Sequence, residues 1–120
     1  MREPSHRHRA ERHGRAGERA AAWWLRLHGW RIVGQRVRAP GGEVDLIARR
    51  AKVCAFVEVK MRKDGEALAT AIDEYRLRRV VAAANALTAR YARGATDIRI
   101  DVILIRPWRW PIHLVNVWHG

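Results

Sequence analysis

Residues 42–62 read GEVDLIARRAKVCAFVEVKMR and carry the clearest structural signal in the chain. Two runs within them, 43–49 and 53–62, are rich in β-branched residues, and the short segment Arg50-Ala51-Lys52 separates the runs. β-branched side chains favour strands, and two strands joined by a short turn form a hairpin. The pattern therefore predicts an antiparallel hairpin, although Ala-Lys is a poor residue pair for a tight turn.

This hairpin would bring two acidic side chains together. If it turns at Ala51 and Lys52, Asp45 lies directly opposite Glu58, with Cβ atoms about 5 Å apart. Lys60 lies two positions after Glu58, so both side chains project from the same face of their strand. Paired carboxylates repel each other unless a cation bridges them, and Mg²⁺ accepts such oxygen ligands. The alternative is that each acid pairs with a nearby arginine on a solvated face of the sheet.

A helix is expected before the hairpin, over 13–28. Its apolar residues recur at spacings of four, three and four, which predicts one buried stripe made of Ala16, Ala20, Trp23 and Leu27. Residues 1–10 are polar and basic, so we expect a disordered basic arm there and a single domain over 11–120. A strand over 30–38 would lead into the turn at 39–42.

The second half of the chain predicts one more helix and two strands. Thr70 and Asp73 resemble a capping box at the start of an amphipathic helix. Its apolar stripe consists of Leu77, Val80, Val81, Ala84, Leu87 and Tyr91. Strands are expected at 98–105, which reads as buried on both faces, and at 113–118. The predicted fold is α/β, an αβββαββ core in which helices flank a mixed sheet.

The chain carries a large positive charge. In 120 residues, 24 Lys and Arg stand against 12 Asp and Glu, a formal net charge of +12. Such a charge attracts phosphate backbones, and the arginine fork suits phosphate, so nucleic acid is the expected partner. The alternative is that genomic base composition produced an arginine-rich chain. Charge alone says nothing about catalysis.

Several classes of protein are disfavoured by composition. Cys54 is the only cysteine, so an internal disulfide is excluded and a reducing compartment is expected. The basic N-terminal residues are not followed by the apolar segment of a signal peptide. No apolar run approaches the roughly 20 residues of a membrane-spanning helix. We therefore expect a cytoplasmic protein that does not enter a membrane.

The strand motifs resemble those of a known family. Residues 42–48, GEVDLIA, and 56–62, FVEVKMR, resemble the YraN-like uncharacterised family, as do GERAAAWWL at 17–25 and IRIDVI at 98–103. That family is assigned to the restriction-endonuclease-like, or PD-(D/E)XK, superfamily and is similar to archaeal Holliday-junction resolvases. The superfamily pattern, an acid on one strand and then acid, any residue, lysine on the next, matches Asp45, Glu58 and Lys60.

The resemblance implies a metal-dependent endonuclease that hydrolyses phosphodiester bonds, with DNA, including branched DNA, as the expected substrate. Asp45, Glu58 and the backbone carbonyl of Val59 would hold Mg²⁺ or Mn²⁺, and Lys60 would orient or help deprotonate the attacking water. Glu18 on the first helix is a fourth candidate, because superfamily resolvases often place an acid there. Its alternative is a surface ion pair with Arg15 or Arg19.

The expected nucleic-acid contacts are basic residues near the chemistry and on the second helix: Arg62, Lys63, Arg76 and Arg79. Such families often carry a lysine where Arg76 stands. Six tryptophans could stack on bases, fill the core or form the interface of a homodimer. Glu43 could assist Asp45, whereas a hydrogen-bonding structural role is expected for Asp101 in its apolar strand.

Two functions outside catalysis stay open at this point. A nucleic-acid-binding module could keep the nuclease-like fold and the charge without cleaving. A scaffold within a larger complex would need no substrate of its own.

Overall fold

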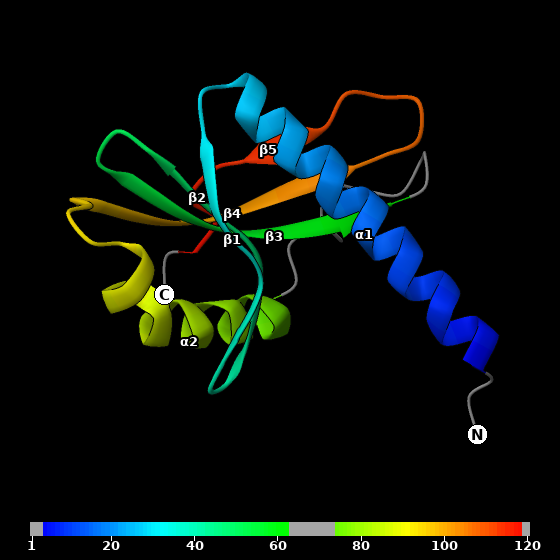
Figure 1. The fold of residues 1–120 in the computed structure, drawn as a ribbon, viewed down its shortest axis with the longest axis horizontal. Coiled ribbons are helices and arrows are strands. Elements are labelled where there is room, and N and C mark those ends of the chain that lie inside the picture. The colour runs from blue at the N-terminus through cyan, green and yellow to red at the C-terminus, as the bar shows by residue number, and fades with distance from the viewer. Residues whose placement is uncertain (1–3, 63–73, 119–120) are drawn as a thin grey trace.

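The computed structural model describes residues 4–62 and 74–118, with side chains from Arg15 in the first helix and from Tyr75 in the second. These residues form two helices and five strands in the order that the sequence predicts, and Figure 1 shows how they are arranged. They are α1 (Pro4–Leu27), β1 (Arg31–Ala39), β2 (Gly42–Arg50), β3 (Val53–Met61), α2 (Glu74–Tyr91), β4 (Asp97–Ile105) and β5 (Ile112–Leu114). The αβββαββ prediction is confirmed.

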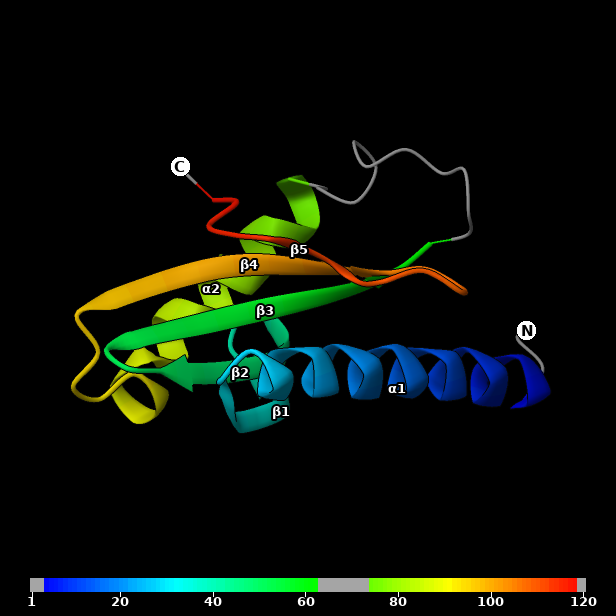
Figure 2. The same cartoon turned by 90° about the horizontal axis from the view of Figure 1, so that it is seen from above.

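The strands form one mixed sheet in the order β1-β2-β3-β4-β5. β1, β2 and β3 pair antiparallel, β3 and β4 pair parallel, and β5 pairs antiparallel with β4. The parallel pair follows from the crossover through α2, since two parallel strands cannot be joined by a tight turn. The two helices lie on opposite faces of the sheet, as Figures 1 and 2 show.

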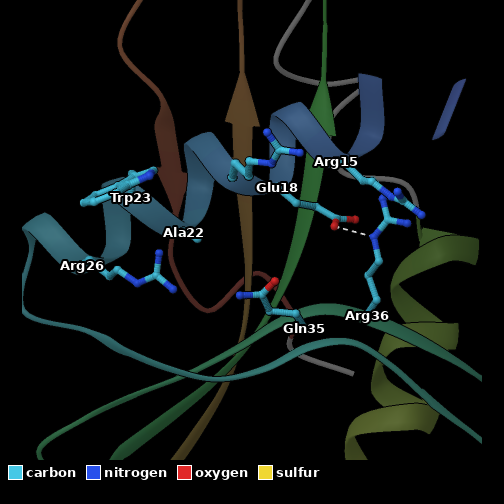
Figure 3. Close-up of a pocket in the computed structure, with 8 residues that line it drawn as sticks. Arg15, Glu18, Ala22, Trp23, Arg26, Gln35 and Arg36 are labelled. Atoms are coloured by element: carbon cyan, nitrogen blue, oxygen red, sulfur yellow. Dashed lines mark hydrogen bonds and ion pairs between the residues drawn. The ribbon is translucent and has the colours of Figure 1, made fainter. Parts of the chain in front are cut away.

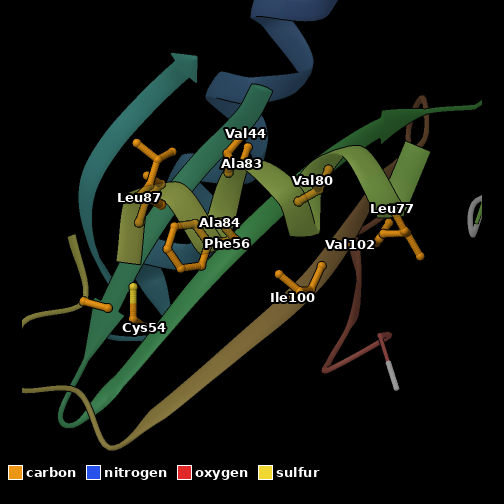
Figure 4. Packing of buried hydrophobic residues seen from close by; sticks show 12 residues of the cluster. Val44, Cys54, Phe56, Leu77, Val80, Ala83, Ala84, Leu87, Ile100 and Val102 are labelled. Atoms are coloured by element: carbon orange, nitrogen blue, oxygen red, sulfur yellow. The ribbon is translucent and has the colours of Figure 1, made fainter. Parts of the chain in front are cut away.

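Each helix covers its own hydrophobic core. Figure 4 shows the core between α2 and the sheet, in which Phe56 of β3 packs under the helix. The other buried members on that face are Val44, Ile47, Cys54, Leu77, Val80, Ala83, Ala84, Leu87, Ala92, Ile100 and Val102. The α1 face is built from Ala21, Ala22, Leu25, Trp30, Leu46, Ala48, Ala55, Val57, Ile103 and Ile105. Because neighbouring residues of a strand face opposite sides, Glu58 and Lys60 share the α2 face with Phe56.

The buried stripe of α1 differs from the predicted one. Trp23 is 62% exposed and Leu27 is 73% exposed, whereas Ala21 and Leu25 are fully buried. Small residues let the helix axis approach the sheet closely. Gly17 lies on the same side of the helix, and a Cβ at this position would lie 2.7 Å from Cγ of Met61. Large side chains such as Trp23 are therefore directed away from the sheet.

Helix α1 also begins earlier than its apolar periodicity predicts. It starts at Pro4, so residues 4–10, expected in a disordered arm, are helical, while residues 1–3 lie outside the described chain. Proline suits the first turn of a helix because its missing N–H has no partner there. The apolar pattern could not reveal this first part, since these residues carry no apolar stripe. Thr70 and Asp73, the expected capping box, also lie outside the described residues.

The last strand is shorter than predicted. β5 covers only Ile112–Leu114, and the chain turns at Asn116, whose φ is 53°. The backbone N–H of Val117 then donates to the carbonyl of Ile100 on β4, 2.8 Å away. The alternating pattern of 113–118 resembles a strand, but this turn interrupts the pairing.

The hairpin of β2 and β3 has the predicted register. Arg50 pairs with Val53 and Leu46 with Val57, so the turn lies at Ala51 and Lys52. Ala51 adopts a φ of 51°, which is unfavourable for alanine. The carbonyl of Lys52 accepts hydrogen bonds from the N–H groups of Thr96 and Asp97, 2.9 and 3.2 Å away. These tertiary contacts hold a turn that its own residues do not favour.

We expect Gly42→Ala to destabilise the protein, because a Cβ at this position would overlap the backbone carbonyl of Arg79 on α2. Backbone cannot yield as a flexible side chain can, so a loss of about 1–3 kcal/mol is expected in urea unfolding. Gly17→Ala is the matched control. Its new methyl group would meet only the Met61 side chain, which is partly exposed and can move. Equal stability of the two variants would contradict the contact between the β1–β2 turn and α2.

Candidate active site

Asp45 and Glu58 line the same cavity, which has a volume of about 220 Å³ and lies between β2, β3 and α2. Its other lining residues are Glu43, Arg76, Arg79 and Val80. The two acids therefore meet in one cavity, although Asp45 and Glu58, predicted to lie opposite each other, are not among the β2–β3 pairs, and α2 adds two arginines to the site.

The strand β2 is irregular at Asp45. Val44 and Ile47 both pack in the core under α2, although residues three apart would face opposite sides of a regular strand. The β2–β3 pairs run from Arg50 only as far as Leu46. Beyond them, Oδ2 of Asp45 accepts a hydrogen bond from the backbone N–H of Val59, 2.8 Å away. This bond ties the Asp45 carboxylate to the strand that carries Glu58.

Glu58 and Lys60 are both buried, with exposed fractions of 5% and 3%. Oε1 of Glu58 lies 3.2 Å from Nζ of Lys60 and 3.3 Å from Nε of Arg76. Oε2 is also buried, yet it has no hydrogen-bond partner among the residues that the structure describes. A buried carboxylate oxygen without a donor is uncommon and leaves one ligand position open.

The environment of Asp45 disfavours its charge. Burial raises the pKa of Asp45 from 3.8 to about 6, against the hydrogen bond from Val59, which lowers it. The negative charges of Glu18, Glu58 and Glu43 act in the same direction as burial and contribute to this rise. Above about pH 6 the site therefore holds an ionised Asp45 whose negative charge its surroundings disfavour, although arginines line the same cavity.

A divalent cation fits this arrangement. No group of three or more His, Cys, Asp or Glu side chains gathers around one point in the part of the chain that the structure describes. Mg²⁺ does not need such a cage, because it binds through one or two carboxylates, keeps several waters and accepts a substrate phosphate. A divalent cation in the cavity would give Oε2 of Glu58 a partner and would offset the unfavourable charge of Asp45. The donor set suits Mg²⁺ or Mn²⁺ better than a softer metal.

Glu18 does not line this cavity. Its Oε2 lies 2.6 Å from Nε of Arg36 on β1, so its partner is neither Arg15 nor Arg19, the two partners considered from the sequence. Glu18 still lies close enough for its charge to raise the pKa of Asp45. Its side chain is directed from α1 toward β1, as its position in line with Ala22 and Leu25 predicts.

Three further residues were expected near the site: Arg62, Lys63 and Glu43. Arg62 follows directly after β3, and its guanidinium donates to the carbonyl of Met61, 2.9 Å away. Lys63 lies outside the described residues. Glu43 is exposed and pairs with Arg38 at 3.2 Å, although it also lines the cavity of Asp45.

Asp101 has the structural role that its apolar strand predicts. It is fully buried and accepts three hydrogen bonds of 2.8 Å, from Arg99, His113 and the backbone N–H of Asn116. All its partners belong to β4 and the C-terminal segment, and none lines the cavity of Asp45 and Glu58.

Arg36 lies beside the site, and the sequence did not reveal its role. Pairs of β1 with β2 join Gln35 to Leu46 and Val37 to Val44, so Arg36 lies at the level of Asp45. Its φ is 50°, an uncommon conformation for a residue other than glycine. The hydrogen bond to Glu18 raises the pKa of Arg36, and the charges of Glu43 and Asp45 contribute in the same direction. Nothing in a run of alternating strand residues signals this local kink.

We expect Asp45→Asn to stabilise the metal-free protein above pH 6 by up to about 3 kcal/mol. This free energy corresponds to the rise of the Asp45 pKa from 3.8 to about 6. Because the folded pKa lies above the unfolded value, stability is lost as pH rises from about 4 to about 6. Asparagine carries no charge and can still accept the Val59 N–H. Urea unfolding in EDTA at pH 8 and pH 4 tests this expectation. A variant that is less stable than the wild type at pH 8 would contradict it.

Comparison with known proteins supports the resemblance found in the sequence. Residues 17–105 match Uncharacterised protein family UPF0102, a span that contains α1 from Gly17, the whole hairpin and β4. A UPF0102 protein of Rhizorhabdus wittichii is 71% identical over 111 residues, covering 92% of this chain and 94% of its own. Another from Sphingopyxis alaskensis is 64% identical over 109 residues, with coverages of 91% and 94%. None of the helices in the described chain is long and apolar enough to cross a membrane. Because the family model and both relatives match most of its length, the chain belongs to the YraN-like family UPF0102.

Proposed function

We propose that this protein is a metal-dependent nuclease that hydrolyses phosphodiester bonds of DNA. The observation that carries the proposal is the buried carboxylate of Glu58, which has one oxygen without a partner among the described residues and lies in one cavity with Asp45. A buried carboxylate oxygen without a donor costs free energy, and sites that keep such a cost are often functional.

Each residue has a distinct role in the proposed reaction. Asp45 and Glu58, with the carbonyl of Val59, would hold Mg²⁺ or Mn²⁺, which supplies Lewis acidity and a lowered pKa for a bound water. Lys60, 3.2 Å from Glu58, would orient the attacking water and offset negative charge on the phosphate in the transition state. Arg76 and Arg79 on the cavity wall would position the phosphate backbone.

The net charge of the chain supports nucleic acid as the substrate. Twelve positive charges in excess favour binding to a polyanion, and the two arginines of α2 place positive charge at the cavity itself. Branched DNA is the substrate class to examine beside linear DNA, given the likeness of the strand motifs to those of resolvases.

One observation favours a second candidate, a nucleic-acid-binding module that does not cleave. Lys60 and Arg76 already pair with Oε1 of Glu58, so two cations partly neutralise this acid without a metal. In a binding module these ion pairs would be permanent, and divalent ions would leave protein stability unchanged.

Cleavage of a substrate panel separates the two candidates. Junction, flap, linear duplex and single-stranded DNA, with an RNA strand beside them, are incubated with Mg²⁺, with Mn²⁺ and with EDTA. We expect cleavage of DNA with either metal and none in EDTA. Binding without cleavage under every metal condition would support the module and contradict the nuclease.

A further inference from the structure

A second, larger cavity lies between α1 and β1, and the Glu18–Arg36 ion pair forms part of its wall. Its volume is about 410 Å³, and Arg15, Glu18, Arg19, Ala22, Trp23, Arg26, Gln35 and Arg36 line it. Figure 3 shows Trp23 and Arg26 at one end of this cavity and Arg15 with the Glu18–Arg36 pair at the other. We call it the α1 cavity.

The α1 cavity holds unbalanced positive charge. Four arginines line it against one acid, and that acid, Glu18, is bound to Arg36. Neither Arg15 nor Arg19 has an ion pair or hydrogen bond with any residue of the described chain. Guanidinium groups that line one cavity without carboxylate partners suit a phosphate, to which each can donate two parallel hydrogen bonds.

The cavity also offers an aromatic surface. Trp23 is 62% exposed, and the Arg26 guanidinium lies 5.7 Å from the centre of its ring. An indole ring beside arginines can stack on a nucleobase, a contact that unpaired bases of any sequence can make. Gln35, exposed on β1, adds an amide that can donate or accept hydrogen bonds.

The backbone of β1 is bent where it meets this cavity. Gln35 and Arg36 both line the α1 cavity, although adjacent residues of a regular strand face opposite sides. The φ of 50° at Arg36 accounts for the break in alternation. Such strain costs about 1–3 kcal/mol and is typical of functional positions. Arg36 also lies at the level of Asp45 in the β1–β2 pairing, so the strained residue is next to the strand segment that carries this acid.

We propose that the α1 cavity binds an unpaired nucleotide of a DNA strand, with its base on Trp23 and its phosphates on Arg15 and Arg19. The proposal rests on the proposed nuclease function and narrows its substrate to DNA with an unpaired segment next to the bond that is cut. A continuous duplex would not place a free base in this cavity, because its bases stay stacked.

Binding of labelled DNA in EDTA tests the cavity independently of cleavage. The probes are a thymidine homopolymer strand, a blunt duplex of equal length and thymidine monophosphate. Their binding is measured by fluorescence anisotropy or by competition. We expect Trp23→Ala to weaken binding of the strand by about 5-fold to 150-fold and Trp23→Phe to retain most of it. Duplex binding should stay unchanged. The Arg15→Ala, Arg19→Ala double variant should lower the salt slope by about 0.7 for each lost phosphate contact.

Matched controls exist elsewhere on the surface. Trp108→Ala removes a fully exposed tryptophan outside the cavity, and Arg31→Ala removes an exposed arginine of β1. Three results would each overturn the proposal. The first is an equal loss of affinity for strand and duplex in Trp23→Ala, and the second is no loss of affinity in that variant. The third is that binding of the monophosphate depends on Trp23 while binding of the strand does not. If Trp23 is needed for strand binding but no substrate is cut, the proposed chemistry fails and the cavity stands. If DNA is cut and Trp23→Ala binds the strand normally, only the cavity fails.

Discussion

Glu58→Gln is expected to abolish divalent-dependent cleavage, with a rate loss of about 10²-fold to 10⁴-fold, while DNA binding in EDTA stays within a few fold of the wild type. The amide keeps the size of the side chain and can still accept from Lys60, so the fold should survive. It cannot supply the negative charge that a cation at the unpartnered Oε2 position requires. Asp45→Asn should give the same loss for the same reason.

The matched control is Asp97→Asn, which removes an exposed carboxylate at the start of β4. It should cleave like the wild type. Calorimetric titration with Mg²⁺ or Mn²⁺ adds a readout besides activity: the wild type should bind the ion and gain thermal stability from it, and Glu58→Gln should do neither. Glu58→Gln with undiminished cleavage would remove the basis of the nuclease assignment.

Asp101→Ala should cause a large loss of stability, about 3–5 kcal/mol, because it leaves the half-buried Arg99 without its carboxylate partner. His113 and the N–H of Asn116 would lose their acceptor as well, and the C-terminal turn would lose its attachment to β4. This is a large share of the stability of a domain, typically about 5–15 kcal/mol. Urea unfolding with fluorescence detection measures it, and DNA affinity of the folded fraction should be unaffected.

Asp101→Asn gives a milder variant in case Asp101→Ala does not fold. Burial would raise the pKa of Asp101, but the hydrogen bonds from His113, Arg99 and Asn116 outweigh it and hold the pKa below 3.8. The stabilisation by this charge is therefore present above about pH 4 and is lost as pH falls through the lower folded pKa. The stability difference between Asp101→Asn and the wild type should shrink below pH 4. A difference that grows on acidification would contradict this role.

Much of the candidate site could be predicted from local patterns. The β-branched runs around Ala51 and Lys52 predicted the hairpin register, and this register brings Asp45 and Glu58 into one cavity. The two-residue repeat of a strand predicted that Glu58 and Lys60 share a face, and their ion pair agrees. These predictions succeed because pairing in a tight hairpin depends on residues close together in sequence.

Predictions about packing distance were less successful. Ala16, Ala20, Trp23 and Leu27 recur with helical spacing, yet the structure buries Ala21 and Leu25 because small residues allow α1 to approach the sheet. Trp23 is exposed because this other side of α1 is buried, and its exposed side chain lines the α1 cavity. The length of α1 toward Pro4 and the early end of β5 also had no apolar signature.

The amino-acid sequence alone predicted the order of the elements, the pairing of β2 with β3 and the candidate acidic pair, because periodicity and turn position act over a few residues. The depth of Glu58, the Glu18–Arg36 ion pair and the kink at Arg36 arose only when distant segments packed together. Burial and electrostatic environment depend on neighbours far along the chain, and no local pattern of residues encodes them.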